Sequence, residues 1–172
     1  MSQLDLIGDG LETYTGARDA LDRYYTPAPI TDALMARLHS ILPEAERVEV
    51  LEPCAGRQLA IAEVVRSWSP RYRVWTADLD PGAPVDQHGD ALEQDWTEVN
   101  GGRPWDLVIT NPPFGLAAPL IAHLTHHARC VVCLARLSLL EPVEDRAGLL
   151  TGRDLPGSYR LAPGWGLARV IV

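Results

Sequence analysis

The sequence contains no lysine, and all of its 15 basic residues are arginines. Against 23 acidic residues they leave a formal net charge of −8 at pH 7. A protein that binds nucleic acid on its own usually carries a basic surface. The composition therefore gives no sign of a self-sufficient nucleic-acid-binding protein, and any function on DNA has to accommodate this charge.

Cysteines and long apolar runs are also scarce. Three cysteines, an odd number, argue against a disulfide framework. No apolar run approaches the roughly 20 residues that a membrane-spanning helix needs. Residues 1–5 lack the basic and apolar regions of a signal peptide. With 172 residues, 47% of them hydrophobic, we expect one cytoplasmic domain with a sizeable core and no membrane association.

Apolar strands alternate with helical patterns along the chain, which predicts an α/β protein. Strands are expected at 48–51, 73–77, 106–110 and 129–134, and helices near 31–42, 59–68 and 116–127. This order indicates βαβ units, a mostly parallel sheet and helices on both of its faces.

Both ends of the chain depart from this alternation. Residues 159–161 and 167–172 predict a C-terminal antiparallel hairpin. Residues 1–20 are weakly patterned and are expected to form an N-terminal arm. That leaves 21–172 as a single domain.

Polar residues and a glycine follow the predicted strands. Glu52 closes the first strand, and Gly56 permits a tight turn in which backbone amides can meet a polar ligand. Asp78 ends the next strand, where nucleotide-binding sites commonly place an acid for ribose hydroxyls. Asp90 lies in a later turn. Each of these alone is more often a simple turn or helix cap, and only their order and spacing favour a ligand site.

An Asn-Pro-Pro-Phe motif at 111–114 follows the apolar run at 107–109. The Asn111 side-chain oxygen and the Pro112 carbonyl can each accept one hydrogen from an NH2 group. The Phe114 ring can stack on a planar base. The alternative without a function is a rigid turn after a strand. The amide, the carbonyl and the aromatic ring together favour methyl transfer to a planar amide or amino nitrogen.

In this order the motifs resemble the catalytic core of S-adenosylmethionine-dependent N6-adenine DNA methyltransferases, particularly the phage and prophage kind. The resemblance covers residues 20–146, and 111–114 is its most specific part. Residues 22–27 resemble the family's Tyr-x-Thr-Pro element, which contacts the methionine part of the cofactor. Residues 51–56 resemble its first cofactor motif, and 89–92 its adenine-binding element. Residues 136–141 resemble a segment found in phage members.

The resemblance implies a Rossmann-like class I methyltransferase fold with S-adenosylmethionine as cofactor. The implied cofactor-binding residues are Tyr25, Thr26, Pro27, Glu52, Cys54, Gly56, Asp78, Asp90 and Asn111. The implied catalytic residues are Asn111, Pro112, Pro113 and Phe114. The target adenine would be flipped out of the duplex and stacked on the aromatic ring. We expect Cys54 to be a packing residue rather than a nucleophile.

No metal site is expected. Cys130 and Cys133 fall on one predicted strand, where residues three apart point to opposite faces. The nearby histidines at 123, 126 and 127 share a helix surface instead. A packing role is therefore favoured over a zinc site.

Two departures from the family pattern leave alternatives open. The family's Gly-x-Gly is here Gly56-Arg57-Gln58, so the Gln58 side chain either crowds the cofactor or turns outward, and the loop gains a cation. The second departure is that only residues 147–172 follow Arg146, so no separate target-recognition domain is expected.

Three functions follow from these observations. The leading hypothesis is adenine-N6 methylation of DNA, alone, on single strands or with a DNA-binding partner. An RNA base or a protein glutamine amide is an alternative acceptor. The third is a non-catalytic subunit of the same fold. The sequence predicts neither the recognition sequence nor the oligomeric state.

Overall fold

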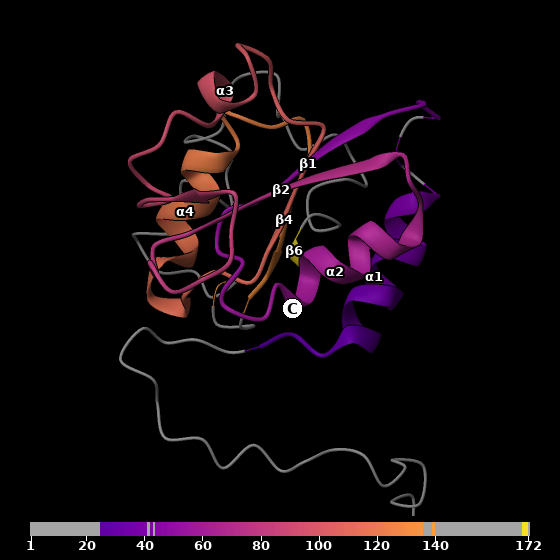
Figure 1. Cartoon of the computed structure of the whole chain (residues 1–172), viewed down its shortest axis with the longest axis horizontal. Helices are drawn as coiled ribbons and strands as arrows, with labels where there is room; N and C mark the ends of the chain where they lie inside the picture. Colours follow the sequence, from indigo (N-terminus) through magenta and orange to yellow (C-terminus); the bar gives the residue numbers. More distant parts are fainter. Residues whose placement is uncertain (1–24, 41, 43, 136–138, 140–169, 172) are drawn as a thin grey trace, which may run out of the picture.

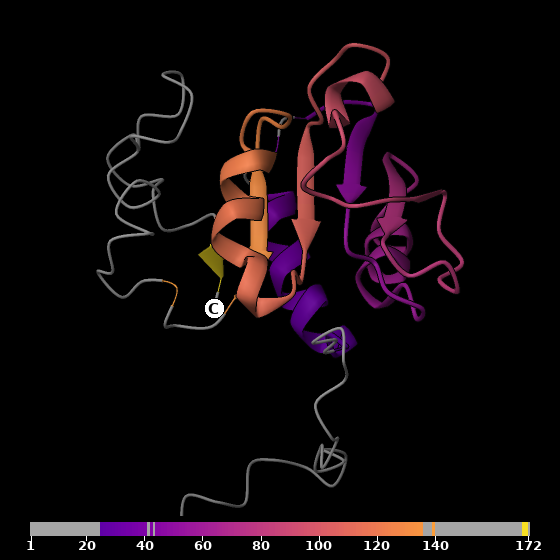
Figure 2. The ribbon, with the colours of Figure 1, turned by 90° about the vertical axis from the view of Figure 1, so that its left-hand side faces the viewer.

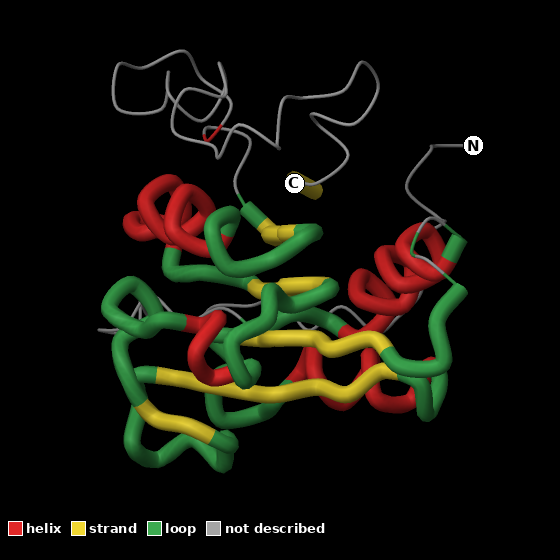
Figure 3. The backbone as a smooth tube through the Cα atoms, turned by 90° about the horizontal axis from the view of Figure 1, so that it is seen from above, coloured by secondary structure: helices red, strands yellow, loops and turns green. Residues whose placement is uncertain are grey.

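A computed structural model of the chain describes residues 25–40, 42, 44–135, 139 and 170–171. Its centre is a six-stranded sheet in the order β3-β2-β1-β4-β5-β6, and every described strand pair is parallel (Figure 1). The strands are β1 Val48–Glu52, β2 Tyr72–Asp78, β3 Gln87–His88, β4 Leu107–Thr110, β5 Val131–Leu134 and β6 Val170–Ile171. Seen from above, they run side by side through the middle of the molecule (Figure 3).

The strand order reverses direction in the middle of the sheet. From β1 the chain moves outward to β2 and β3, and it then returns to place β4 on the other side of β1. Val50 pairs with Val74 of β2 and with Leu107 of β4. Such a reversal opens a crevice at the carboxyl ends of the strands, which is where open α/β sheets bind ligands.

Helices cover both faces of the sheet. They are α1 Ala28–His39, α2 Ala60–Trp68, α3 Trp96–Val99 and α4 Ala117–Leu124, with a short 3-10 helix η1 at Phe114–Leu116. Figure 2 shows α4 in front of the strands and α1 behind them. No helix in the described part of the chain is long and apolar enough to cross a membrane.

Each central strand contributes side chains to two cores. On β4, Leu107 and Ile109 pack with α1 and α2, whereas Val108 packs with α4. All three side chains are fully buried. Because successive side chains of a strand point to opposite faces, a parallel strand covered on both sides is apolar throughout. This explains the continuous apolar run at 107–109 and confirms the predicted α/β fold.

The predicted elements are confirmed with shifted ends. The first helix starts earlier than expected, at Ala28, because Pro27 precedes it and Pro29 fits its first turn. The helix expected at 116–127 ends at Leu124. The sequence patterns missed β3 and α3, since both are too short to show a periodicity. Helix α3 begins where the Asp95 side chain accepts hydrogen bonds from the amides of Thr97 and Glu98.

At the C-terminal end, β6 runs parallel to β5, with Cys133 paired to Val170. The predicted antiparallel hairpin would pair 167–172 with 159–161, and it stays a prediction. The other half of the predicted hairpin, 159–161, lies outside the described residues, as do the predicted arm at 1–20 and most of the segment at 136–141.

Candidate functional site

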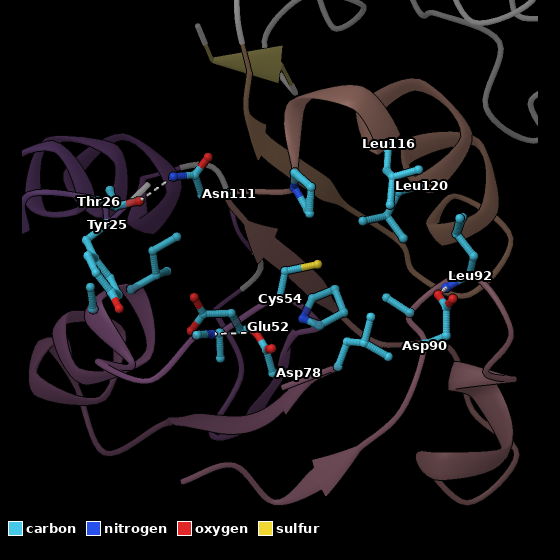
Figure 4. A pocket seen from close by; sticks show the side chains of 18 of the residues that line it. Tyr25, Thr26, Glu52, Cys54, Asp78, Asp90, Leu92, Asn111, Leu116 and Leu120 are labelled. Atoms are coloured by element: carbon cyan, nitrogen blue, oxygen red, sulfur yellow. Dashed lines mark hydrogen bonds between the residues drawn. The ribbon is translucent and has the colours of Figure 1, made fainter. Parts of the chain in front are cut away.

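A cavity of about 450 Å³ opens at the carboxyl ends of β1, β2 and β4 (Figure 4). Nine of the predicted site residues line it: Tyr25, Thr26, Glu52, Cys54, Gly56, Asp78, Asp90, Asn111 and Pro113. Pro27, Pro112 and Phe114 are not among the residues that line it. The fold therefore gathers residues from five separate chain segments around one ligand-sized space.

Asp78, at the end of β2, is held by two backbone amides. The Gly56 amide donates to Oδ2 over 2.7 Å, a bond marked in Figure 4, and the Asp80 amide donates to Oδ1 over 2.8 Å. Gly56 has φ +64°, a left-handed conformation that glycine adopts without strain. Each carboxylate oxygen has a further lone pair, so Asp78 can accept from two ligand hydroxyls while remaining in place.

Glu52, at the end of β1, is 1% exposed, and its Oε2 finds no hydrogen-bond partner among the described residues. Burial raises the pKa of this carboxyl to about 8, and the charge of Asp78 adds to the rise. The Ala62 backbone and the Arg66 charge act in the opposite direction. A buried carboxyl with one unpartnered oxygen beside a cavity is suited to a ligand that brings a hydrogen-bond donor or a positive charge.

Cys54 lines the same cavity, but its thiol is not activated as a nucleophile. Burial, together with the nearby Asp78 charge, raises the pKa of its thiol to about 12. The thiol is therefore protonated at neutral pH, and the thiolate that nucleophilic attack requires is absent. This agrees with the packing role expected from the sequence.

The Asp90 turn forms another wall of the cavity. The Leu92 amide donates to Asp90 Oδ1 over 2.9 Å. The indole nitrogen of Trp96, a fully buried residue, donates to the Ala91 carbonyl over 3.0 Å. The turn is thus anchored to α3, and it presents Asp90 beside the apolar side chains of Ala91 and Leu92.

Asn111, at the end of β4, is oriented by a residue 85 positions away. Its Nδ2 donates to Thr26 Oγ1 over 3.2 Å, and Thr26 is buried. Figure 4 shows the amide nitrogen towards Thr26 and the oxygen pointing away from it. This assignment of the amide leaves Oδ1 as the end that can accept from a ligand NH2 group.

Only part of the motif at 111–114 lines the cavity. Asn111 and Pro113 line the cavity, whereas Pro112 is buried in the protein and Phe114 is half-buried at the start of η1. Leu116, two residues further, lines the cavity and is 46% exposed. The motif therefore lies at the boundary between the cavity and the surface.

The charge of the cavity is one-sided. Glu52, Asp78 and Asp90 line it, and the described lining residues include no arginine or histidine. Arg57, in the loop after β1, is paired with Asp80 over 2.7 Å. Gln58 is exposed and is not a lining residue, so it leaves the cavity clear. The site suits a ligand with positive charge and offers no side-chain cation for a phosphate.

Several lining residues escaped the sequence prediction because they are apolar. Leu79 directly follows Asp78, Leu116 lies two residues after Phe114, and Leu120 lies on α4. For Leu79 and Leu116, proximity to the predicted motifs was the available signal. The Arg57–Asp80 pair was also missed, since it joins two different loops.

Solved methyltransferases share this fold. The rRNA methyltransferase AviRa from Streptomyces viridochromogenes superimposes with a TM-score of 0.52 at 15% identity, over 68% of this chain and 76% of the other. A protein assigned to the class I S-adenosylmethionine-dependent methyltransferases, from Listeria monocytogenes, gives 0.56 at 16% identity, over 74% and 51%. The methyltransferase subunit of a type I restriction-modification system from Streptococcus thermophilus gives 0.57 at 14% identity, over 75% and 39%.

At these identities the similarity concerns the fold, which is the Rossmann-like class I methyltransferase fold. The chain spans about half the length of the Listeria protein and less of the Streptococcus subunit. No protein-family model and no curated protein matches the sequence.

Proposed function

We propose that this protein is an S-adenosylmethionine-dependent methyltransferase that methylates the N6 amino group of adenine in DNA. The observation that carries the proposal is the hydrogen bond from Asn111 to Thr26 at the edge of an acid-lined cavity. With the amide nitrogen bonded to Thr26, the amide oxygen points away from Thr26 (Figure 4). An NH2 group on a planar base is the partner that this arrangement suits.

The charge of the cavity favours S-adenosylmethionine over a phosphate-bearing nucleotide. The cofactor carries a sulfonium and an ammonium group, and the side chains of Asp78, Asp90 and the buried carboxyl Glu52 line the space with no side-chain cation. Glu52, whose Oε2 has no partner among the described residues, would take the ammonium. Asp78 would take the ribose hydroxyls, and Asp90 the adenine amino group.

The acceptor would approach from the outer side of the motif. When bound, the cofactor supplies an electrophilic methyl group. The Asn111 oxygen and the Pro112 carbonyl would hold the two hydrogens of the target NH2, and Phe114, outside the cavity wall, would stack on the base. Holding both hydrogens weakens conjugation of the lone pair with the ring and aims it at the methyl group. Rate would come from alignment and preorganised dipoles, without a strong general base.

A protein glutamine amide or an RNA base is the second candidate acceptor. One observation favours the glutamine amide over an RNA base, because a protein acceptor has no phosphates around its NH2 group. Tyr25, Leu79 and Leu116 line the cavity with 43%, 60% and 46% of their surface exposed, beside the acids and without a cation. A non-catalytic subunit is less favoured, because the outward Gln58 leaves the cavity clear.

Transfer of a labelled methyl group from S-adenosylmethionine to double-stranded DNA, single-stranded DNA, RNA and protein tests the proposal. We expect labelled adenine in DNA with the wild-type chain. In Asn111→Ala, which removes one preorganised hydrogen-bonding group, the rate should fall about 100- to 1,000-fold. Calorimetry should show nearly unchanged cofactor binding in that variant.

Other outcomes separate the alternatives. Label in RNA or protein but not in DNA would establish the second candidate. Absence of binding heat at millimolar cofactor would favour the non-catalytic subunit. Unchanged turnover in Asn111→Ala would contradict the mechanism.

A further inference from the structure

Arg57 connects the loop after β1 with the loop after β2, which lie next to the cavity residues Gly56 and Asp78. Its Nε lies 2.7 Å from Asp80 Oδ2, and its Nη2 lies 3.3 Å from Asp80 Oδ1. Two parallel bonds of this kind fix a guanidinium against a carboxylate in both distance and plane. Asp80 is 6% exposed, whereas the Arg57 side chain is 56% exposed, so the carboxylate is shielded and solvent reaches the guanidinium.

The pair completes a ring of hydrogen bonds around Asp78. The amide of Gly56, the neighbour of Arg57, donates to Asp78 Oδ2. The amide of Asp80 donates to Asp78 Oδ1, and the amide of Gly82 donates to Asp80 Oδ1 over 2.9 Å. The loop after β1 and the loop after β2 are therefore joined twice, once through Asp78 and once through Arg57.

The loop after β1 contains a conformation that needs such support. Leu59, the residue before α2, has φ +50°, in the left-handed region that residues other than glycine rarely adopt. Gln58 stands where a second glycine would give the loop more freedom. An ion pair to the neighbouring loop can hold this backbone in place.

The space around the guanidinium is fitted to it. A Cβ atom added at Gly82 would lie 2.9 Å from Arg57 Nη2 and 3.3 Å from Asp80 Oδ1. Real Cβ atoms essentially never come as close as 2.9 Å, so an alanine at position 82 would displace the flexible end of the arginine side chain. Gly82 thus leaves room for the guanidinium in its observed position.

We propose that Arg57 is a positioning residue: through Asp80 it holds Asp78 and the Gly56 amide in the geometry that receives the ribose hydroxyls of the cofactor. This rests on the proposed function for the identity of the ligand. Arg57 itself does not line the cavity, and its side chain is 56% exposed. It acts on the ligand only through the acids and amides that it orders.

The proposal predicts an effect on binding without one on chemistry. In Arg57→Ala the dissociation constant for S-adenosylmethionine should rise about tenfold, because the site is no longer preorganised. The turnover at saturating cofactor should be unchanged. Arg57→Lys keeps the positive charge but cannot make the bidentate pair, so its dissociation constant should lie between those of Arg57→Ala and the wild type. Gly82→Ala, which keeps both charges, should weaken binding in the same direction as Arg57→Ala.

A control and a ligand-free measurement accompany this test. The Arg129 side chain is 73% exposed, and its Nε lies 3.7 Å from Asp106 Oδ1. Arg129 comes just before β5, so it lies at the amino ends of the strands, away from the cavity at their carboxyl ends. Arg129→Ala should bind cofactor like the wild type. In the empty protein, hydrogen exchange of the Gly56 amide should be about tenfold faster in Arg57→Ala and unchanged in Arg129→Ala.

The outcomes distinguish this proposal from the one on which it rests. Equal exchange rates and equal cofactor affinity in Arg57→Ala and the wild type would overturn the role of Arg57, as would an equal effect of Arg129→Ala. If the wild type does not bind S-adenosylmethionine, the proposed function fails. The exchange rate of the Gly56 amide then decides by itself whether Arg57 orders the loops.

Discussion

The two sides of the candidate site are held in different ways. On the proposed cofactor side, Asp78 is fixed by backbone amides from its own loop and from the adjacent loop. On the proposed acceptor side, Asn111 is fixed by the hydroxyl of Thr26, which belongs to a different segment of the chain. The first side depends on the backbone of two neighbouring strand ends, whereas the second includes a long-range contact between the side chains of Asn111 and Thr26. Substitutions on the two sides should therefore separate binding from catalysis.

The largest effect in this comparison is expected at Asp78. Asp78→Ala removes a charged acceptor for two ligand hydroxyls, each bond contributing about 1.5–3 kcal/mol, so the cofactor dissociation constant should rise about 100-fold or more. Glu93→Ala makes the same charge change at an exposed position that does not line the cavity, and it should bind cofactor like the wild type. Calorimetry measures both. Equal binding by Asp78→Ala and Glu93→Ala would remove Asp78 from the proposed site.

A smaller effect, and one on catalysis, is expected at Thr26. Thr26→Val keeps the shape of this buried side chain and removes the hydroxyl that orients Asn111. Loss of one neutral hydrogen bond, about 1–1.5 kcal/mol, should lower kcat about tenfold and leave cofactor binding unchanged. Thr26→Ser keeps the hydroxyl and should retain most of the activity. A change in cofactor affinity without a change in kcat would instead place Thr26 on the cofactor side.

The smallest effect is a pH dependence of stability from Glu52. Its folded-state pKa of about 8 lies above the ordinary value of 4.5, so between these values the folded protein holds a proton that the unfolded chain lacks. This contribution to the free energy of unfolding is complete below pH 4.5 and is lost as the pH rises through 8. The urea midpoint of the empty protein should therefore fall from pH 7 to 8.5, and it should fall less in Glu52→Gln.

Between pH 7 and 8.5, the effect of Glu52 on stability is separated from that of His127. Burial lowers the pKa of His127 below 6.5, so its own contribution changes only below neutral pH. An equal decrease of the urea midpoint in Glu52→Gln and the wild type would show that another group is responsible.

Much of the fold and the position of the site could be predicted from the sequence. The apolar run at 107–109 is buried on both faces of the sheet, and this burial is what produces the run. Glu52 and Asp78 end strands and Asn111 follows one, and parallel strands bring their carboxyl ends to one side of the sheet. Local patterns were sufficient here, because the period of a strand and the direction of a parallel sheet decide the outcome.

The rest depended on contacts between residues far apart in the sequence. Short elements such as α3 depend on a cap and on the burial of Trp96 rather than on a repeating pattern. The parallel pairing of β6 with β5 joins segments separated by more than thirty residues. No local pattern specifies such a neighbour.

The sequence by itself determined the order of the longer strands and helices, the ends of the strands at which the candidate site lies and the polar residues that line it. Only the tertiary structure decided that Gln58 is exposed and that Phe114 is not among the lining residues. It also decided that Thr26 orients Asn111 and that Arg57 joins Asp80. The physical reason is that backbone periodicity is a local property of the chain. The direction of a side chain is set by the neighbours that folding brings to it.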